Sequence, residues 1–546
     1  MTPTDESPDM LLNDALDASR RQVMLGMDIP WLLDDWVERS PDKPFMIWEP
    51  FSGEPARWTY AELQREARGV AAGLAERGVE SGDFVLLHLD NSPEFIISWF
   101  ACAELGVVAV STNTRSVGRD MTYFAEHTSA VCAITQPRFA TMIQEACPGL
   151  RFLAVTDNDV GEPADIPEGL QAIGFADLHS EIDGWERRPP DPFANLGVQF
   201  TSGTTSRPKA VLWTHANGVW AGMVSAAHMR LRREDVCLVF LPMFHTNAQA
   251  YSMLATLWTG GTFVMQPKFS ASRFWATSLK HKATWLSTIP FSFKALMGLP
   301  VPEHHYRFWG TAVHLGVVEE HFGVATLGWW GMTETLTQGI VSDYDHPGPE
   351  MSIGRAASEY EIQVRTADGP LAGPGESGRL FIRGIRGVSL FKEYYNNPDA
   401  NHSAFDSDGW FDTGDIIRVG DDGYLFFSDR DKDMLKTGGE NVAASEVESV
   451  IMLTGLVEEC AVVGQKHYML DEVPVAFVIP KAETPPALEE QIISFCKENL
   501  ADFKVVREVH VVDSLPRSTL AKVAKNELRD RLSPVTAPAD ADRRQA

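Results

Sequence analysis

Apolar residues recur at helical spacing in two stretches near the start of the chain. Residues 59–78, with the sequence TYAELQREARGVAAGLAERG, and residues 93–106, with the sequence PEFIISWFACAELG, both show this spacing and end on Gly. These patterns predict two helices. A short apolar run typical of a buried strand follows each of them, and the same rhythm recurs near residues 131–155 and 236–266. Such alternation predicts a mainly parallel sheet with helices on both faces.

The pattern changes from about residue 350 onward. Residues 361–384 place short strand-like runs between Gly and Pro turns, which predicts a small β-rich unit. After residue 430, helical patterns at 445–455 and 487–500 lie between apolar strand-like runs, which predicts a separate small α+β domain. The C-terminal end is rich in Pro, Ala and Asp, a composition typical of a disordered tail.

The composition is that of an ordinary globular protein. Of the 546 residues, 44% are hydrophobic and 22% are charged, so most of the chain should fold. No apolar run approaches the roughly 20 residues that cross a bilayer, and the acidic N-terminus lacks the pattern of a signal peptide. The six cysteines stand far apart without a CxxC pair, which favours a reducing cytoplasm over a disulfide framework or a zinc site.

The formal charge of −28 sets a condition on any binding site. A strongly acidic surface argues against nucleic acid and against anionic membranes as partners. A polyanionic ligand must therefore be bound by local basic groups, backbone N–H groups and metal ions rather than by the overall field.

One loop has the composition of a phosphate-binding site. The sequence FTSGTTSRPKAV at 200–211 follows an apolar strand-like run and gathers hydroxyl residues around Gly203. Small residues let the backbone approach a polyphosphate, and their N–H and O–H groups can donate to its oxygens, while Arg207 and Lys209 supply positive charge. A Ser/Thr-rich loop is more often a polar surface loop, and the Walker pattern GxxxxGK[ST] is absent from the sequence.

Further motifs follow this loop along the chain. They are LPMFHTN at 241–247, WGMTET at 330–335, DGWFDTGD at 408–415, SDRDKDMLKTGGEN at 428–441 and LPRSTLAKVAKNEL at 515–528. Together with TSGTTSRPK, and in this order, they resemble the adenylate-forming acyl-CoA synthetase superfamily of acyl- and aryl-CoA ligases, luciferases and peptide-synthetase adenylation domains. The resemblance covers about residues 28–532 and is greatest to the crotonobetaine/carnitine–CoA ligases.

The resemblance implies an α/β fold with two main domains. The expected large domain, residues 28–430, binds the adenylate and combines mainly parallel sheets, flanking helices and a small β-rich subdomain. A small mobile α+β domain is expected at 431–532, an N-terminal extension at 1–27 and the disordered tail at 533–546.

The resemblance also implies roles for individual residues. The expected ATP- and AMP-binding residues are Thr201, Ser202, Gly203, Thr204, Thr205, Lys209, Trp330, Gly331, Thr333, Asp415 and Arg430; the catalytic residues are Lys522, Glu334 and His245, with Glu334 holding Mg²⁺; the hinge is Lys432; and the CoA-binding residues are Lys436, Gly438, Gly439 and Glu440. Taken alone, a single His is usually structural, a DTGD sequence is usually a turn, and a Lys in such a C-terminal segment is usually a solvated charge. The matched order of the motifs favours the functional interpretation of all three.

The implied activity is that of a carboxylic acid–CoA ligase. A carboxylate attacks the α-phosphorus of ATP to give acyl-AMP and pyrophosphate, and Mg²⁺, the phosphate loop and Lys522 offset the developing charge. The small domain then turns about Lys432, and the thiolate of CoA displaces AMP from the acyl group.

Several positions depart from the family's pattern. Ala210 and Ala521 each stand where Gly is usual, and an Ala costs about 1 kcal/mol or more if the site needs a positive φ. Trp330 replaces a Tyr and keeps a stacking ring, whereas Trp329 adds bulk beside the adenylate. Residues 309–323 replace a longer Gly-Gly-Ala-Pro loop. Most of these changes affect the nucleotide half of the site.

Alternative functions therefore stay open at this point. The first is a ligase with impaired adenylation that takes preformed acyl-AMP from a separate adenylating enzyme and only transfers it to CoA. The others are an adenylation domain that loads a carrier protein, a luciferase-like oxygenase, and a non-catalytic binder of a nucleotide or acyl-adenylate. A bulky natural-product acid and a small polar acid such as carnitine are both compatible with the sequence, and the resemblance leaves a homodimer open.

Overall fold

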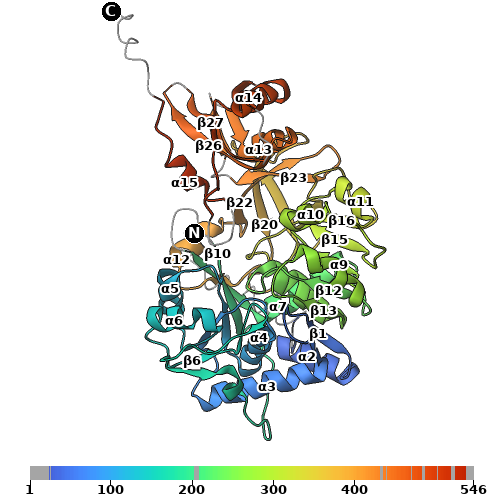
Figure 1. The fold of residues 1–546 in the computed structure, drawn as a ribbon, viewed down its shortest axis with the longest axis vertical. Coiled ribbons are helices and arrows are strands. Elements are labelled where there is room, and N and C mark those ends of the chain that lie inside the picture. Colours follow the sequence, from blue (N-terminus) through green and yellow to red (C-terminus); the bar gives the residue numbers. More distant parts are fainter. Residues whose placement is uncertain are drawn as a thin grey trace, which may run out of the picture. The chain divides into compact units, whose positions relative to one another are not determined.

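The protein divides into two compact units in the computed structural model (Figure 1). The structure describes residues 24, 26–201, 208–430, 434–437, 440–468, 470–481, 486–500, 502–517 and 523–535. Unit 1 comprises the chain up to Ile362 together with Ile382–Phe411, and unit 2 comprises Gln363–Phe381 together with the chain from Asp412 onward. The units are defined by which parts of the chain are in contact. The expected boundary after residue 430 instead separates a large domain from a mobile small domain, so the expected domain limits stay a prediction.

The first sheet of unit 1 carries the phosphate-loop motif at one side. Among the described residues its eight strands have, from edge to edge, the order β21 (Glu393–Tyr394), β11 (Lys209–Thr214), β10 (Asn195–Thr201), β4 (Val108–Ser111), β3 (Phe84–His88), β5 (Cys132–Thr135), β6 (Phe152–Val155) and β9 (Ala172–Gly174). Strands β10 to β9 run parallel to one another, whereas β11 and β21 are antiparallel additions. The predicted parallel sheet is therefore confirmed, with an antiparallel extension beside the phosphate loop.

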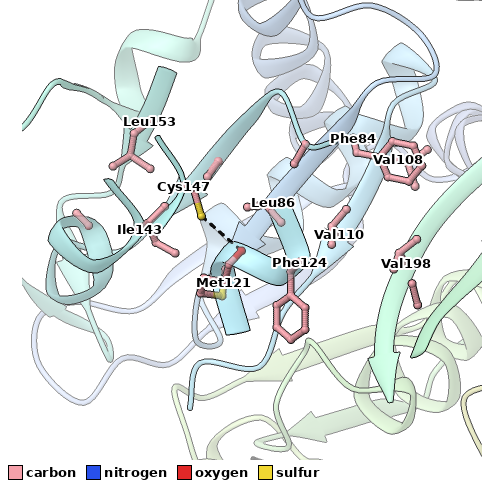
Figure 2. Close-up of a cluster of buried hydrophobic side chains, with 14 of the residues drawn as sticks. Phe84, Leu86, Val108, Val110, Met121, Phe124, Ile143, Cys147, Leu153 and Val198 are labelled. Carbon is pink, nitrogen blue, oxygen red and sulfur yellow. Dashed lines mark hydrogen bonds between the residues drawn. The ribbon is translucent and has the colours of Figure 1, made fainter. Parts of the chain in front are cut away.

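Apolar side chains bury this sheet. Figure 2 shows Phe84 and Leu86 of β3, two residues apart and so on one face, within a cluster that includes Met121 and Phe124. The cluster continues to helix α6 (Pro137–Ala146), where the Cys147 thiol after the helix donates a 3.5 Å hydrogen bond to the carbonyl of Met121 (Figure 2). Because their side chains are buried, the strand sequences are almost wholly apolar.

The second sheet of unit 1 carries the WGMTET motif. Within the described chain its nine strands have the order β18 (Arg355–Ala356), β17 (Ile340–Val341), β16 (Ala325–Trp330), β15 (Phe308–Thr311), β14 (Trp285–Ser287), β12 (Val236–Val239), β13 (Thr262–Met265), β1 (Pro44–Trp48) and β2 (Ala56–Thr59). Strands β16 to β1 are parallel, and the outer strands at both edges are antiparallel. A small hairpin, β7 (Asn158–Asp159) and β8 (Glu162–Pro163), lies outside both sheets.

Local capping signals set the ends of the helices of unit 1. These helices are α2 (Ile29–Arg39), α3 (Tyr60–Glu76), α4 (Pro93–Leu105), α5 (Gly118–Thr128), α6 (Pro137–Ala146), η1 (Phe175–Leu178), α7 (His215–His228), η2 (Asn247–Leu254), α8 (Ala255–Thr259), α9 (Ala271–Lys280), α10 (Pro290–Leu296), α11 (Gly316–Phe322) and α12 (Pro398–Ala404). Helix α3 starts with a capping box of Thr59 and Glu62. Helix α4 starts with Ser92 and a following Pro, and it ends at Gly106, whose φ is 79°. Both helices predicted from the sequence are confirmed.

Unit 2 is built on two sheets. One has the order β19 (Glu361–Arg365), β20 (Ser377–Arg383), β22 (Phe411–Val419) and β23 (Leu425–Arg430). The other has the order β25 (Glu440–Ala443), β24 (Met434–Thr437), β27 (Asp471–Pro480) and β26 (Val457–His467), with β28 (Glu508–Val511) also paired to β27. The helices are α13 (Ala444–Leu453), α14 (Leu488–Asn499), η4 (Asp502–Lys504) and α15 (Lys525–Arg529). The β-rich unit and the α+β region predicted from the sequence are both present.

A helix needs about 20 predominantly apolar residues to cross a membrane. Within the described part of the chain, no helix is both long enough and apolar enough for this.

A buried carboxylate fastens helix α2 to the rest of unit 1. Asp28 is fully buried, and its Oδ1 accepts a 2.8 Å hydrogen bond from the backbone N–H of Trp31 at the start of the helix. Nη2 of Arg187 lies 2.5 Å from Oδ1, and Nη2 of Arg188 lies 3.2 Å from Oδ2. Arg188 also donates to Nε2 of His215 at 2.9 Å, and burial beside the two arginines holds the pKa of His215 well below its usual range.

Replacement of Asp28 by Ala should destabilise unit 1. The variant loses the helix cap and leaves two partly buried guanidinium groups without this carboxylate, so we expect about 3–5 kcal/mol less free energy of unfolding. Asp35→Ala is the matched control, because Asp35 pairs at i,i+4 spacing with Arg39, whose side chain is 61% exposed, and such a pair is worth at most about 0.5 kcal/mol. Thermal unfolding measures both, and equal midpoints for the two variants would contradict the assignment.

Candidate functional site

The two ends of the predicted phosphate loop meet in an antiparallel hairpin. Thr201 on β10 and Lys209 on β11 are directly paired across the two strands. Residues 202–207, and with them the predicted ligands Ser202, Gly203, Thr204 and Thr205, lie outside the described residues. Strand β10, before the loop, is parallel to its neighbour β4, whereas β11, after the loop, is antiparallel to β10.

Ala210 does not carry the backbone strain that a Gly-to-Ala difference can bring. It pairs with Phe200 inside the hairpin and is fully buried. The described non-glycine residues with positive φ do not include it. The condition under which an Ala at this position costs stability is therefore not met. Ala521, the second such departure, lies outside the described residues.

Glu334 provides a buried carboxylate in the turn after β16. The turn is closed by backbone N–H groups of Thr335 and Leu336, which donate to the carbonyl of Met332 at 3.1 and 3.2 Å. Leu336 is fully buried and has a φ of 66°, a conformation that is uncommon for a side chain of this kind. Glu334 itself is 4% exposed. A carboxylate that is buried in this way destabilises the protein unless polar groups pair with it.

The Glu334 carboxylate accepts a hydrogen bond from Tyr394. The Tyr394 hydroxyl donates to Oε1 of Glu334 at 2.9 Å, and the backbone N–H of Phe391 donates to the Glu334 carbonyl at the same distance. Nζ of Lys209 lies 4.5 Å from the centre of the Tyr394 ring, which is within range of a cation–π interaction. One tyrosine thus contacts the predicted metal ligand and the last cation of the phosphate loop.

A second group of contacts joins the loop around Thr333 to the segment around His245. Thr246 donates to Oε1 of Gln199 at 2.7 Å and lies 3.1 Å from the Thr333 hydroxyl, while Nε1 of Trp213 donates to the Thr333 carbonyl at 3.0 Å. His245 lies one position before Thr246.

The polar group continues inward from Gln199. Nε2 of Gln199 donates to Oε1 of Gln249 at 3.0 Å, and Nε2 of Gln249 donates to the Ser111 hydroxyl at 3.2 Å. The backbone N–H of Gln249 donates to the carbonyl of His245 at 3.0 Å as the π-helix η2 begins. Strand ends of β4 and β10 are thereby linked to the turn that carries His245, and π-helical segments are frequent at functional sites.

The bulk of Trp329 is accommodated by a glycine on the neighbouring strand. A Cβ on Gly310 would lie 1.6 Å from Cη2 of Trp329, so the indole occupies the space that a side chain there would need. The ring also packs edge-on against Tyr251, with centroids 6.0 Å apart. A Cβ on Gly331 would in turn lie 2.3 Å from the Tyr251 hydroxyl. Trp330 points to the opposite face of β16, beside Gly339.

Two predicted ribose-binding residues are paired in unit 2. Asp415 on β22 and Arg430 on β23 are opposite each other in the antiparallel register. Asp415 is 5% exposed. Such pairing explains how two motifs fifteen positions apart in the sequence come to one place, since cross-strand partners are neighbours on a sheet.

The predicted CoA-binding residues belong to a second hairpin of unit 2. Lys436 on β24 and Glu440 on β25 lie at its two sides, with Thr437 paired to Glu440. Gly438 and Gly439 between them, the predicted hinge Lys432 and the predicted catalytic Lys522 lie outside the described residues. The roles of all these residues stay predictions.

Comparison with known proteins decides the family. The sequence profile described as "AMP-binding enzyme" matches residues 33–395, which is well over half of the chain, and the profile "AMP-binding enzyme C-terminal domain" matches residues 446–522. The chain belongs to the AMP-binding enzyme family. Its expected membership of the adenylate-forming superfamily is thereby confirmed.

Named relatives of this AMP-binding enzyme are CoA ligases. Crotonobetaine/carnitine–CoA ligase from Escherichia coli O127:H6 is 34% identical over 523 residues, which cover 93% of this chain and all of that one. The crystal structure of ATP-bound MatB from Rhodopseudomonas palustris superposes with a TM-score of 0.81 at 26% identity, covering 92% of this chain and 99% of that one. O-succinylbenzoate CoA synthetase (MenE) from Bacillus subtilis, in complex with ATP and a magnesium ion, gives a TM-score of 0.78 at 25% identity, covering 91% and 99%. The α/β fold and the assignment to the acyl-CoA ligases are confirmed.

Several residues that contact the predicted site residues or their neighbours in the chain have no role in the sequence motifs. Tyr394 lies in the string FKEYYNNPDAN, which contributed to the resemblance without a role being assigned to the tyrosine. Gln199 and Tyr251 gave no local signal, because single polar or aromatic residues in apolar strands and helices have no characteristic spacing. Their contacts arise from sheet order and helix packing.

The pair of Gly310 and Trp329 gives a test of this packing. Gly310→Ala should lower the free energy of unfolding by about 1–3 kcal/mol, because the new methyl group forces the indole to move. The same change made in a Trp329→Ala background should cost much less. Gly298→Ala is the control, since a Cβ there would meet nothing within 4 Å.

Thermal midpoints of the wild-type protein, the two single variants and the double variant measure the coupling. An equal cost of Gly310→Ala with and without the indole would show that the two residues do not compete for the same space.

Proposed function

We propose that this AMP-binding enzyme joins a carboxylic acid to CoA through an acyl-AMP intermediate, with ATP and Mg²⁺. The observation that carries the proposal is the arrangement around Glu334. This buried carboxylate shares Tyr394 with Lys209, and Lys209 belongs to the hairpin that closes the phosphate loop. A carboxylate, a cation and a hydroxyl-rich loop together suit a metal-bound triphosphate.

The chemistry of Glu334 fits Mg²⁺. This ion takes oxygen ligands and is usually bound by one or two carboxylates together with substrate phosphates. Glu334 would be its protein ligand, and the bound ion would supply positive charge against the phosphate oxygens. The described residues contain no cluster of three or more His, Cys, Asp and Glu side chains able to hold a metal ion.

The chain's own groups would act in two half-reactions. In the first, the 201–209 loop with Lys209, together with Lys522, stabilises the charge that develops as the acid attacks the α-phosphorus and pyrophosphate leaves. Asp415 and Arg430 hold the ribose. In the second, the segment of Lys436, Gly438, Gly439 and Glu440 meets CoA after rotation about Lys432, and the thiolate attacks the acyl carbonyl while AMP leaves.

A panel of acids tests the activity. The wild-type enzyme with ATP, Mg²⁺ and CoA is given carnitine, crotonobetaine, anthranilate, benzoate and o-succinylbenzoate in turn. Pyrophosphate release and formation of the acyl-CoA, followed by mass spectrometry, are expected with at least one acid. The alternative in which a separate enzyme supplies acyl-AMP predicts thioester from synthetic acyl-AMP and CoA, but no pyrophosphate from ATP. Absence of both products with every acid and every acyl-AMP would refute a ligase.

Lys522→Ala should separate the two half-reactions. Loss of a cation that acts only on the first transition state should lower pyrophosphate release by about 10²- to 10³-fold, while transfer from synthetic acyl-AMP to CoA changes little. Lys525→Ala is the matched control, because that lysine forms a 2.8 Å ion pair with Glu448. Equal losses in both half-reactions would argue against the assigned role.

A cytoplasmic location is part of the same proposal. All six cysteines are free thiols, and five of them are buried, as expected in a reducing compartment.

Light scattering on the purified protein tests whether it forms a homodimer.

A further inference from the structure

We infer that Tyr394 is a positioning residue, which orients the Glu334 carboxylate for the Mg²⁺-bound triphosphate and couples it to the phosphate loop. This inference rests on the proposed function. It adds a residue to which the sequence motifs assign no role, and it gives the hydroxyl and the ring of Tyr394 separate tasks.

The hydroxyl acts on the carboxylate. Tyr394 is 3% exposed and Glu334 is 4% exposed, so their 2.9 Å hydrogen bond is shielded from water. A hydrogen bond to an ionised carboxylate in such a place is stronger than one between neutral groups. It fixes the rotation of the carboxylate about its last side-chain bond, and Mg²⁺ demands nearly ideal ligand geometry.

The ring acts on the phosphate loop. Nζ of Lys209 lies 4.5 Å from the ring centre, so the ammonium group is held at the end of the loop by the same side chain. Lys209 also begins strand β11, the strand that pairs with β21 through Val211 and Tyr394. Movement of the Tyr394 ring would therefore change its contacts with both Glu334, the predicted metal ligand, and Lys209, at the end of the phosphate loop.

The backbone of Tyr394 is itself held firmly. Its N–H donates to Oδ1 of Asn401 at 2.8 Å, and Nδ2 of the same asparagine donates back to its carbonyl at 2.9 Å. Next to it, the N–H of Tyr395 donates to the carbonyl of Ala210 at 2.8 Å. A side chain on a doubly clamped backbone can hold a ligand in one orientation, as the outer partners of metal ligands do.

Tyr394→Phe tests the inference because it removes the hydroxyl and keeps the ring. Binding of ATP is measured by calorimetry over a series of Mg²⁺ concentrations. We expect the Mg²⁺ concentration for half-maximal ATP binding to rise about 10- to 100-fold. ATP binding without Mg²⁺, and transfer from synthetic acyl-AMP to CoA, should stay within about threefold of wild type, because neither depends on a metal held by Glu334.

Tyr395→Phe is the matched control. It removes a hydroxyl from the adjacent position, where the ring packs against Phe84 with centroids 4.8 Å apart. Its Mg²⁺ dependence should equal that of the wild-type protein. A general loss of packing would lower the thermal midpoint and weaken ATP binding with and without Mg²⁺, which distinguishes it from loss of orientation.

A Glu334→Gln background gives the decisive comparison. If Tyr394 acts through the carboxylate, Tyr394→Phe adds no further change once Glu334 is an amide. An unchanged Mg²⁺ dependence of Tyr394→Phe, or an undiminished effect in the Glu334→Gln background, would overturn the inference while an active wild-type enzyme keeps the proposed function intact. A wild-type protein that binds no Mg²⁺-ATP and makes no thioester would instead refute the proposed function.

Discussion

The pairing of β21 with β11 is the constraint on which the arrangement of unit 1's site depends. It places Tyr394 opposite Val211, far away in the sequence, and the neighbouring backbone N–H groups of Lys392 and Tyr395 donate to carbonyls of β11 at 2.9 and 2.8 Å. Side chains of the following helix reinforce it, since Thr214 donates to the carbonyl of Gly387 at 2.6 Å and Asn217 donates to that of Leu390 at 2.8 Å. Without this short edge strand, the Glu334 carboxylate and the Lys209 ammonium group would lose the tyrosine that contacts both of them.

Buried polar groups then give the apolar core a single geometry. Hydrophobic contacts are non-directional, whereas the series from Ser111 through Gln249 and Gln199 to Thr246 requires each donor to meet its acceptor. An unpaired member of such a series would be costly in a site shielded from water. The polar series therefore specifies where the Thr333 loop and the His245 turn lie relative to the sheet.

Local sequence signals predicted most of the fold and part of the site. Helices α3 and α4 follow from their caps and spacing, and strand β10 follows from the apolar run before the phosphate loop. The addition of β21, two residues long, left no periodic signal, so Tyr394 could not be assigned to Glu334. The cross-strand pairing of Asp415 with Arg430 likewise depends on register, which a one-dimensional pattern does not contain. The roles of Lys432, Gly438, Gly439 and Lys522 rest on resemblance alone.

The fit of Trp329 over Gly310 restricts how this protein can change. Because the indole fills the place of a Cβ at 310, any side chain added there before position 329 becomes smaller forces the ring to move and costs stability. The reverse order is open, since a smaller residue at 329 only leaves a void. Mutational paths that remodel this part of the protein therefore pass either through a strained intermediate or through one that bears a cavity.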